Sequence, residues 1–444
     1  MISSKKLVAG IGWTTVFYFI AVAFRFVSSV ILSRILSPNI MGMMVVVNTI
    51  RIGAELFSDI GIGQNIIHHK NGDKPTFFNT AWIIQIVRGF LLSAILIFLA
   101  PLIADYYHVD AIIIQVSALT LTISGMMSTS IYMLQRNLRV VQMSAFELSQ
   151  EVLASVIAIL FALYSPTIWS LILANLLATA IRIALTYCLP DARQRVIFSV
   201  QYARQIVSFG KWITLSSLLM FLCANFDRLY LAQVVPLATL GVYGIARAIA
   251  DVPSALVNRL SHSLVFPVIA SARATPLPEV RKQLAPLRLK LLIAAAFMLA
   301  GSICVADLVI KMIYDSRYVE AAWMLPVLLG GIWVTILASL NEYSLLGLGR
   351  PVYGVIGNSL KLGYLSVALP LAFASHGAPG VVIGIALADL PRLLTALVGQ
   401  ARERFSFLAQ DVGTTALLIA FTAVLSFARY IAGFGSSLEI LMRS

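Results

Sequence analysis

The feature that most constrains this chain is a succession of apolar segments, each long enough to cross a lipid bilayer. A spanning helix needs about 20 mostly apolar residues, and the alternating runs of about ten residues typical of transmembrane strands are missing. The fold class expected is therefore an all-α integral membrane protein. We predict thirteen spans, at about 8–32, 40–62, 79–104, 111–134, 144–164, 167–189, 206–234, 240–266, 288–312, 322–347, 354–374, 378–400 and 411–434.

The composition excludes soluble alternatives. Of the 444 residues, 60% are hydrophobic and 11% are charged, and the mean hydropathy is +0.92. Soluble domains carry about 25% charged residues, so this chain lacks the charge to cover a water-exposed surface. A large soluble enzyme, a disordered protein and a coiled coil are excluded. The net charge of +13 would suggest nucleic acid in a soluble protein, but here we assign most of it to membrane topology and expect no nucleic-acid partner.

Basic residues in the predicted loops indicate an orientation. If the N-terminus is cytoplasmic, the inner segments hold 17 Lys and Arg residues and the outer segments hold 3. Cytoplasmic loops of membrane proteins carry such an excess. We therefore expect a cytoplasmic N-terminus and, with thirteen spans, an external C-terminus. The first apolar run continues to Leu32 without a short apolar region and a small-residue cleavage site, so we expect a retained helix and not a signal peptide.

No motif for covalent or metal chemistry is found in the sequence. Cys188, Cys223 and Cys304 fall in three different predicted spans, with neither a disulfide framework nor a metal-binding spacing. P-loop, HExxH and GxSxG motifs are missing. We therefore expect no catalytic residue, no metal and no cofactor, and a protein that is not an enzyme. Coupling to a proton or sodium gradient stays open.

The chain shows one internal repeat. Gly42 and Gly241 each lie near the start of the second span of a half, and the segment 107–111 resembles the segment 317–321. The offset is about 200–210 residues. Because each half has six spans, an even number, the halves share one orientation and are parallel repeats. We predict a six-helix lobe at 1–200, a second six-helix lobe at 201–400, and an extra transmembrane helix with a tail at 401–444.

Charged residues within the spans mark the expected working surface. A charge at the bilayer centre costs at least about 2.5–3.5 kcal/mol, so such side chains should face a partner or an aqueous cavity. Arg51, Glu55 and Asp59 have the spacing of one helix face, and Arg247 and Asp251 repeat part of that pattern in the second half. Internal ion pairs that only fix helix packing are the alternative interpretation.

Central arginines outnumber nearby acids, which favours an anionic substrate. A guanidinium binds phosphate oxygens as a bidentate fork, so the pattern suits phosphate or pyrophosphate better than a cationic drug. Lys361 and Arg392 are equally compatible with a functional role and with snorkelling to the membrane surface. We expect snorkelling for Arg182, Asp307 and Arg429. The predicted substrate-binding residues are Arg25, Arg51, Arg88, Arg228, Arg247 and Arg259. The candidates for ion coupling or gating are Glu55, Asp59, Asp227 and Asp251.

Several short motifs carry a family resemblance. They are Leu36-Ser37-Pro38 with Gly42, Ser58-Asp59-Ile60-Gly61-Ile62-Gly63, Asn225-Phe226-Asp227-Arg228, Gly241-Val242-Tyr243 with Arg247 and Pro253, and Gly349-Arg350-Pro351. With these motifs, residues 5–400 resemble the multidrug/oligosaccharidyl-lipid/polysaccharide (MOP) exporter superfamily. Within it, the chain is similar to the Wzx/WzxC-like polysaccharide transporters, a family of oligosaccharide flippases. It departs from that family by having one extra helix where relatives often have two.

The resemblance implies a multi-pass protein of the bacterial inner membrane. Such proteins move undecaprenyl-pyrophosphate-linked oligosaccharide from the cytoplasmic to the periplasmic leaflet for exopolysaccharide, O-antigen or capsule synthesis. The two lobes would form a V-shaped alternating-access transporter, with the headgroup in an arginine-rich cavity and the polyprenyl tail in lipid. The implied partners are the lipid-linked oligosaccharide, membrane lipids, and the polymerase and glycosyltransferases of the same pathway.

Three alternatives share some of these features. A drug antiporter of the MATE kind would need a net-acidic cavity. A flippase for the lipid-linked peptidoglycan precursor would share the architecture. A membrane glycosyltransferase or polymerase would be expected to show a large extramembrane loop with a carboxylate pair, whereas the longest predicted loop, about 267–287, is basic.

Overall fold

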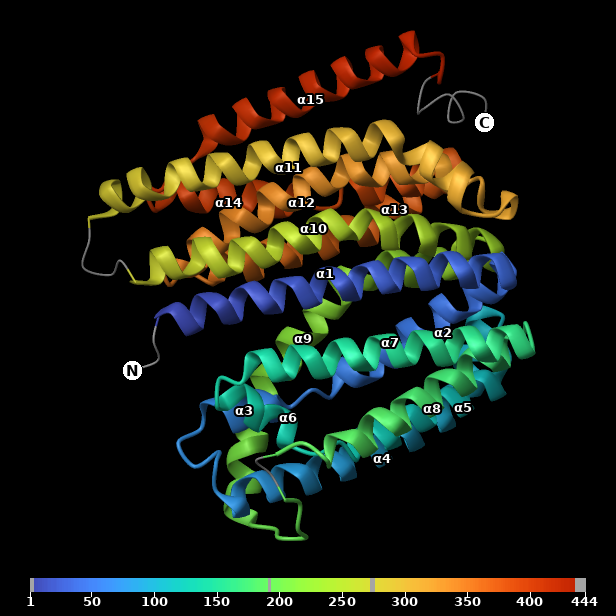
Figure 1. The fold of residues 1–444 in the computed structure, drawn as a ribbon, viewed down its shortest axis with the longest axis vertical. Helices are drawn as coiled ribbons and strands as arrows, with labels where there is room; N and C mark the ends of the chain where they lie inside the picture. The colour runs from blue at the N-terminus through green and yellow to red at the C-terminus, as the bar shows by residue number, and fades with distance from the viewer. Residues whose placement is uncertain (1–3, 191–192, 272–275, 436–444) are drawn as a thin grey trace. The chain divides into compact units, whose positions relative to one another are not determined.

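The computed structural model describes residues 4–190, 193–271 and 276–435, which form helices and no strand (Figure 1). The elements of the first half are α1 (Ser4–Ile35), α2 (Pro38–Phe57), α3 (Ile62–His68), α4 (Pro75–Tyr107), α5 (Ala111–Gly125), α6 (Ser130–Arg136), α7 (Val140–Tyr164) and α8 (Ile168–Thr186). Those that follow are α9 (Val200–Val234), α10 (Leu237–Ser271), α11 (Leu277–Ile313), η1 (Ser316–Tyr318), α12 (Ala321–Gly347), α13 (Val352–Ala386), α14 (Leu390–Arg402) and α15 (Leu408–Ile431). The predicted all-α fold class is confirmed.

The number of spans depends on how one long run is divided. In the described residues, 11 helices are long and apolar enough to cross a membrane, or up to 12 if the bent pair α5 and α6 is one span. Thirteen spans were predicted, and the difference includes the run Val352–Arg402, which is taken as one span of 51 residues. At 1.5 Å per residue, that run far exceeds a hydrocarbon core of about 30 Å. It is also broken at Gly377 (φ 60°, ψ −145°), between the predicted spans 354–374 and 378–400.

The predicted loop at 267–287 is mostly helical. Helix α10 continues to Ser271, and α11 begins at Leu277 after the proline N-cap Pro276. The basic residues around Arg281 end the apolar run without ending the helix, because Lys and Arg are good helix formers. Hydropathy therefore missed the helix boundary. At 35 and 37 residues, α10 and α11 are longer than a bilayer core requires.

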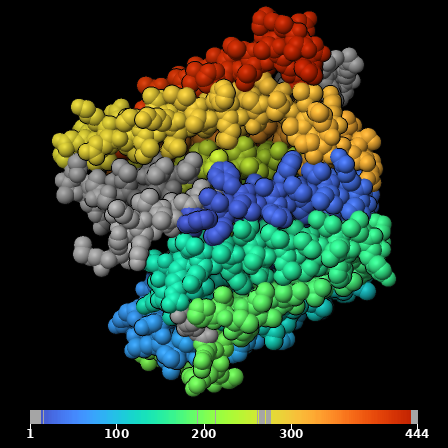
Figure 2. All heavy atoms as spheres, viewed as in Figure 1, coloured from blue at the N-terminus to red at the C-terminus, as the bar shows by residue number. Residues whose placement is uncertain are grey.

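The chain divides into two compact units. Unit 1 comprises Met1–Phe221 with Leu231–Gly241, and unit 2 comprises Leu222–Tyr230 with Val242–Ser444. Within unit 1, α4 packs on α5, and α1 packs on α7. Within unit 2, α11 packs on both α12 and α15, and the space-filling view shows the red α15 lying along the yellow α11 (Figure 2).

Two ion pairs attach α15 to α11. The buried Arg288 of α11 contacts Asp411 near the start of α15, and Arg429 near its end contacts Asp307 of α11 at 2.6 Å. Because one pair joins the early parts of both helices and the other joins their late parts, α11 and α15 run parallel. Asp307 and Arg429 were expected to snorkel; that expectation is wrong, because Asp307 is 1% exposed and bonded to Arg429.

The start of α2 follows directly from its sequence. Ser37 is the N-cap, and its side chain accepts a hydrogen bond from the Ile40 N–H, while Pro38 occupies the first turn. In unit 1 this turn lies against the first turn of α10. A Cβ atom on Gly42 would lie 1.8 Å from the Leu237 carbonyl oxygen, and one on Gly241 would lie 2.1 Å from the Pro38 carbonyl oxygen. The two glycines matched in the repeat therefore both serve close backbone approach.

The other pair of repeat segments forms the turns before α5 and α12. In the first, His108 adopts a left-handed conformation (φ 55°) and ends α4. In the second, the Asp315 side chain caps η1 by accepting hydrogen bonds from the Arg317 Nε and backbone N–H, both at 2.9 Å. These bonds hold the pKa of the Asp315 carboxyl below its ordinary value. Both segments thus connect one long helix to the next, as their matched positions predict.

Candidate functional site

The charged stripe of α2 ends one turn earlier than predicted. Arg51 and Glu55 lie on α2 with Nη1 and Oε1 3.6 Å apart. The helix ends at Phe57, so the prediction that Asp59 continues the same helix face is wrong. Gly61 takes a left-handed conformation (φ 61°), and its N–H donates to Asp59 Oδ1 at 2.9 Å. Glycine and aspartate favour such a turn over a further helical turn.

Arg88 reaches from α4 to the end of α2. Its Nε donates to the Ser58 hydroxyl at 2.8 Å, and its guanidinium also donates to the Glu55 carbonyl oxygen. Carbonyls in the last turn of a helix have no partner within the helix and carry partial negative charge. Among the described residues, no carboxylate oxygen lies within 4.0 Å of an Arg88 nitrogen. Arg88 is thus a cation inside the membrane that is hydrogen-bonded to neutral groups.

A second residue of α4 holds a second helix break. Gln85 is 5% exposed, and its Nε2 donates to the Gly125 and Met127 carbonyl oxygens at 3.2 and 3.1 Å. Those carbonyls lie where α5 gives way to α6, with a bend of 54°. The predicted continuous span 111–134 is broken there. Gln85 and Arg88, three residues apart on α4, therefore each support a different broken helix.

Between these breaks lies a cavity of about 730 Å³ inside unit 1. Its polar lining includes two candidates for ion coupling, Glu55 and Asp59, and one predicted substrate-binding residue, Arg88. The full polar lining is Glu55, Asp59, Gln64, His68, Gln85, Arg88, Ser124, Tyr132 and Gln135. Transporters often place binding sites at discontinuous helices, where side chains and unwound backbone meet.

Two other predicted arginines lie outside this cavity lining. Arg25 of α1 is ion-paired through Nε with Glu151 of α7 at 2.8 Å, and its side chain is 68% exposed. Arg51 lies on α2, and its Nε is buried without a hydrogen-bond partner. Sequence spacing could not reveal the partner of Arg25, because Glu151 is 126 residues away.

Unit 2 contains the cluster predicted around the Asn225-x-Asp227-Arg228 motif. Arg247 Nε lies 3.2 Å from Asp251 and 3.9 Å from Asp227, and Arg228 lies 3.9 Å from Asp251. The Tyr243 hydroxyl donates to Asp227, whose side chain is 7% exposed. The structure therefore brings together four residues predicted separately from two helices. Arg259 lies three turns beyond Arg247 on α10 and is half-buried.

A further charged group extends this cluster, and the sequence did not assign it. Asp389 accepts hydrogen bonds from Lys361 Nζ at 2.9 Å and from the Thr335 hydroxyl at 2.7 Å, and Arg392 lies 3.5 Å away. Arg392 also donates through Nε to Glu342 at 2.7 Å. Arg392 and Lys361 do not snorkel, because each is held by a carboxylate of unit 2.

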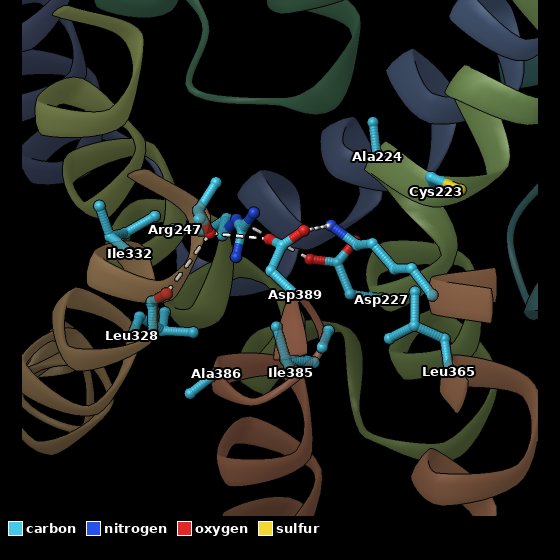
Figure 3. Close-up of a pocket in the computed structure, with 14 residues that line it drawn as sticks. Cys223, Ala224, Asp227, Arg247, Leu328, Ile332, Leu365, Ile385, Ala386 and Asp389 are labelled. Carbon is cyan, nitrogen blue, oxygen red and sulfur yellow. Dashed lines mark hydrogen bonds and ion pairs between the residues drawn. The ribbon is translucent and has the colours of Figure 1, made fainter. Parts of the chain in front are cut away.

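The two groups meet at a small cavity within unit 2. Figure 3 shows Arg247, Asp227 and Asp389 converging on it from α10, α9 and the residue before α14. The cavity holds about 20 Å³, roughly the space of one water molecule. Asp227 Oδ1 is buried and has no hydrogen-bond partner. The arrangement can bind a water molecule or pass a proton between carboxylates, but it is too small for a headgroup.

The charges of the unit 2 network balance. Sequence analysis favoured an excess of arginine, but each cation in this network has an acidic partner. The basic members are Arg228, Arg247, Lys361 and Arg392, and the acidic members are Asp227, Asp251, Glu342 and Asp389. The sequence did not predict the pairs Lys361–Asp389 and Arg392–Glu342, because their members lie 28 and 50 residues apart in sequence. Their only sequence signal was their charge within an apolar run.

Comparison with known proteins identifies the family. The profile of the family described as "Polysaccharide biosynthesis protein" matches residues 31–323, more than half of the chain. This chain belongs to that family. It is 22% identical over 352 residues to the teichuronic acid biosynthesis protein TuaB of Bacillus subtilis, covering 78% of this chain and 72% of TuaB. It is 23% identical over 360 residues to the lipopolysaccharide biosynthesis protein WzxC of Escherichia coli, and the alignment covers 80% of this chain and 70% of WzxC.

Two solved transporter structures share the fold of this chain. The lipid II flippase MurJ in an inward closed conformation has a TM-score of 0.75 at 11% identity, covering 97% of this chain and 95% of MurJ. An inward-facing MATE-family multidrug resistance transporter of the MOP superfamily has a TM-score of 0.61 at 14% identity. The match covers 89% of this chain and 95% of that transporter. The predicted resemblance to MOP-type polysaccharide transporters is confirmed, and the apolar helices of the described residues indicate a multi-pass membrane protein.

Proposed function

We propose that this protein is a flippase for undecaprenyl-pyrophosphate-linked oligosaccharide in the bacterial inner membrane. It moves the repeat unit from the cytoplasmic to the periplasmic leaflet for exopolysaccharide, O-antigen or capsule synthesis, and no covalent bond changes. One observation carries the proposal: both units of a polysaccharide-biosynthesis family member hold ionised side chains inside long apolar helices. Such residues mark transport pathways, because a polar cargo needs polar partners in the membrane.

The arginines provide the chemistry for an anionic headgroup. A pyrophosphate that enters the hydrocarbon region meets the same desolvation penalty as a buried side-chain charge. Guanidinium groups offset that penalty by forming bidentate hydrogen bonds with its oxygens. We assign substrate binding to Arg25, Arg51, Arg88, Arg228, Arg247 and Arg259.

The carboxylates supply candidate sites for gating or ion coupling. A headgroup beside Arg51 or Arg247 competes with Glu55 or Asp251 for the guanidinium, and so weakens that ion pair only in the loaded state. A ligand shifts a conformational equilibrium only through such a difference between states. Asp59 and Asp227 are the other two candidates. The cytoplasmic N-terminus and exchange with the polymerase and glycosyltransferases of the pathway belong to the same proposal.

Complementation in the producing strain tests this function. Deletion of the gene should stop surface glycan export, and Arg51→Ala or Arg228→Ala should restore it poorly at normal membrane abundance. Each loses a charge-assisted contact worth about 1.5–3 kcal/mol, or roughly a tenfold to hundredfold loss of binding. Lys at either position should restore export only partly.

The matched control is Arg350→Ala. Arg350 lies outside the long helices, is 58% exposed, and pairs with Glu403. It should support normal export, because an exposed ion pair contributes about 0–1 kcal/mol. Normal export by both Arg51→Ala and Arg228→Ala would contradict the assignment. Export of peptidoglycan precursor, or efflux of a cationic drug, in place of the glycan would identify one of the alternatives that share this fold.

A further inference from the structure

We propose that the 730 Å³ cavity inside unit 1 is a binding site for a sugar ring of the transported glycan, and this rests on the proposed flippase function. All residues of its lining belong to unit 1, whereas the Arg247 network belongs to unit 2. The cavity is bounded by the α2–α3 break, the α5–α6 break, and the face of α4 that carries Gln85 and Arg88.

One residue of the cavity lining, Gln85, has a buried and unsatisfied hydrogen-bond acceptor. The Gln85 amide nitrogen is used by the carbonyls of Gly125 and Met127, which fixes the orientation of the side chain. Its Oε1 is buried and has no hydrogen-bond partner, although the side chain is only 5% exposed. Buried acceptors are nearly always satisfied. Gln85 lines the cavity, but this oxygen atom is itself shielded, so a ligand donor reaches it only when the lining shifts slightly.

The rest of the lining offers both acceptors and donors. Glu55 and Asp59 provide carboxylate oxygens, and Arg88 provides a guanidinium held in place by Ser58. A hydroxyl both donates and accepts hydrogen bonds, so a polyhydroxylated ring can use every one of these groups. Leu92, Leu121 and the Tyr132 ring supply apolar surface for its C–H groups. The volume is within the range of about 300–1,000 Å³ typical of small-molecule sites.

Other ligand classes fit this lining less well. The described residues contain no group of three or more His, Cys, Asp or Glu that could hold a metal ion. An anion would face two carboxylates, Glu55 and Asp59, against one guanidinium. A neutral sugar meets neither difficulty. Arg88 thus binds the glycan part of the substrate, and the pyrophosphate binds to the other arginines.

Protection of an introduced thiol measures occupancy without requiring transport. Ser124 lines the cavity, and Ser124→Cys is nearly isosteric; Gln135→Cys at an exposed lining position is the second variant. Both are made with Cys188→Ser, because Cys188 is exposed and the other two cysteines are buried. The rate of labelling by a methanethiosulfonate reagent is measured on the purified full-length protein. The control is Val196→Cys, which is 87% exposed in a loop outside the cavity lining.

The probe is the oligosaccharide released by mild acid from the lipid-linked pool of the producing strain. It should slow labelling of the cavity thiols at least fivefold and leave the Val196→Cys thiol unchanged. Adding Asp59→Asn to the cavity-thiol variants should raise several-fold the oligosaccharide concentration needed to protect those thiols from labelling. The Asn amide oxygen can still accept from Gly61, so the turn is kept while the charged acceptor is lost.

Three results would overturn the proposal: no protection of either cavity thiol, equal protection of Val196→Cys, or protection by sodium pyrophosphate or by Na⁺ and not by the oligosaccharide. The outcome is separable from the flippase function. Protection in a protein that does not move lipid-linked glycan would leave the sugar site standing and refute the transport proposal. Transport without protection would refute the sugar site alone.

Discussion

Individual charged residues inside the membrane are stabilised by specific partners, and Lys361 gives the clearest test. Its side chain is 13% exposed and bonds to Asp389 at 2.9 Å. Breaking one partner of a buried pair costs about 3–5 kcal/mol. Because Arg392 also lies near Asp389, we expect Lys361→Met to lower the free energy of unfolding by about 3 kcal/mol, at the low end of that range.

The double variant Lys361→Met/Asp389→Asn should be less destabilised than Lys361→Met alone, because no buried carboxylate is left without its lysine. Thermal unfolding of the purified protein measures both variants. Equal losses for the single and double variants would show that Lys361 and Asp389 do not interact.

A charge exchange between Arg247 and Asp251 illustrates what spacing alone cannot show. The i, i+4 spacing suggests an isolated pair that tolerates exchange. The structure adds Asp227, 3.9 Å from the Arg247 guanidinium and nearly buried. We predict that Arg247→Asp/Asp251→Arg lowers the unfolding temperature, because an Asp at 247 faces Asp227. Wild-type stability of this variant would contradict the interaction of Arg247 with both Asp227 and Asp251.

Ion pairs between residues close in sequence could be predicted, whereas ion pairs between distant residues could not. Arg51 with Glu55 and Arg247 with Asp251 were expected together, because helical spacing places them on one face. The pairs Arg25–Glu151 and Arg392–Glu342 join different helices, and no local rule selects one distant carboxylate over another. Composition located the charges, but only packing assigned their partners.

At the scale of elements, most helix positions and the break at Gly377 followed from hydropathy, whereas the breaks after Phe57 and Gly125 did not. The span predicted at 40–62 ends at Phe57, and that at 111–134 is interrupted after Gly125. A hydropathy window averages over a few turn residues when they are flanked by apolar ones. The Ser58–Gly63 motif did contain the signal, since Asp and two glycines in six residues favour a turn.

The contact between α2 and the first turn of α10 in unit 1 predicts a strict requirement for glycine. A Cβ at Gly42 would overlap the Leu237 carbonyl oxygen, and backbone atoms cannot rotate away. Overpacking typically costs about 1–3 kcal/mol, and we expect Gly42→Ala to reach or exceed the upper value. The matched control is Gly330→Ala on α12, where a Cβ meets no atom within 4 Å. Thermal unfolding and membrane abundance compare the two, and equal behaviour would refute the close approach.

At the scale of the whole molecule, sequence could define the class and the family, and packing defined the units. Apolar runs were sufficient to predict an all-α membrane protein. Short motifs such as Asn225-Phe226-Asp227-Arg228 were sufficient to suggest the resemblance to polysaccharide transporters. The limits of the two units could not be predicted from the sequence. Residues 222–230 of α9 belong to unit 2 although both flanking segments belong to unit 1. A helix shared in this way has no compositional boundary.

Orientation is a prediction for the whole chain. The basic segments should lie in the cytoplasm, so a reporter active only in the periplasm should be inactive when fused after Lys74 and active when fused after Asp110. This follows from the excess of Lys and Arg in alternate loops. The reverse pattern of reporter activity would refute the cytoplasmic N-terminus.

The most direct test of the account is transbilayer movement of labelled undecaprenyl-pyrophosphate-linked oligosaccharide in liposomes containing the purified protein. The lipid is placed in one leaflet, and its appearance in the other is followed with a membrane-impermeant glycan-modifying enzyme. We predict that the wild-type protein and Arg350→Ala transfer the lipid, and that Arg51→Ala and Arg228→Ala transfer it at least about tenfold more slowly. No transfer by the folded wild-type protein, or equal transfer by all four proteins, would contradict the account.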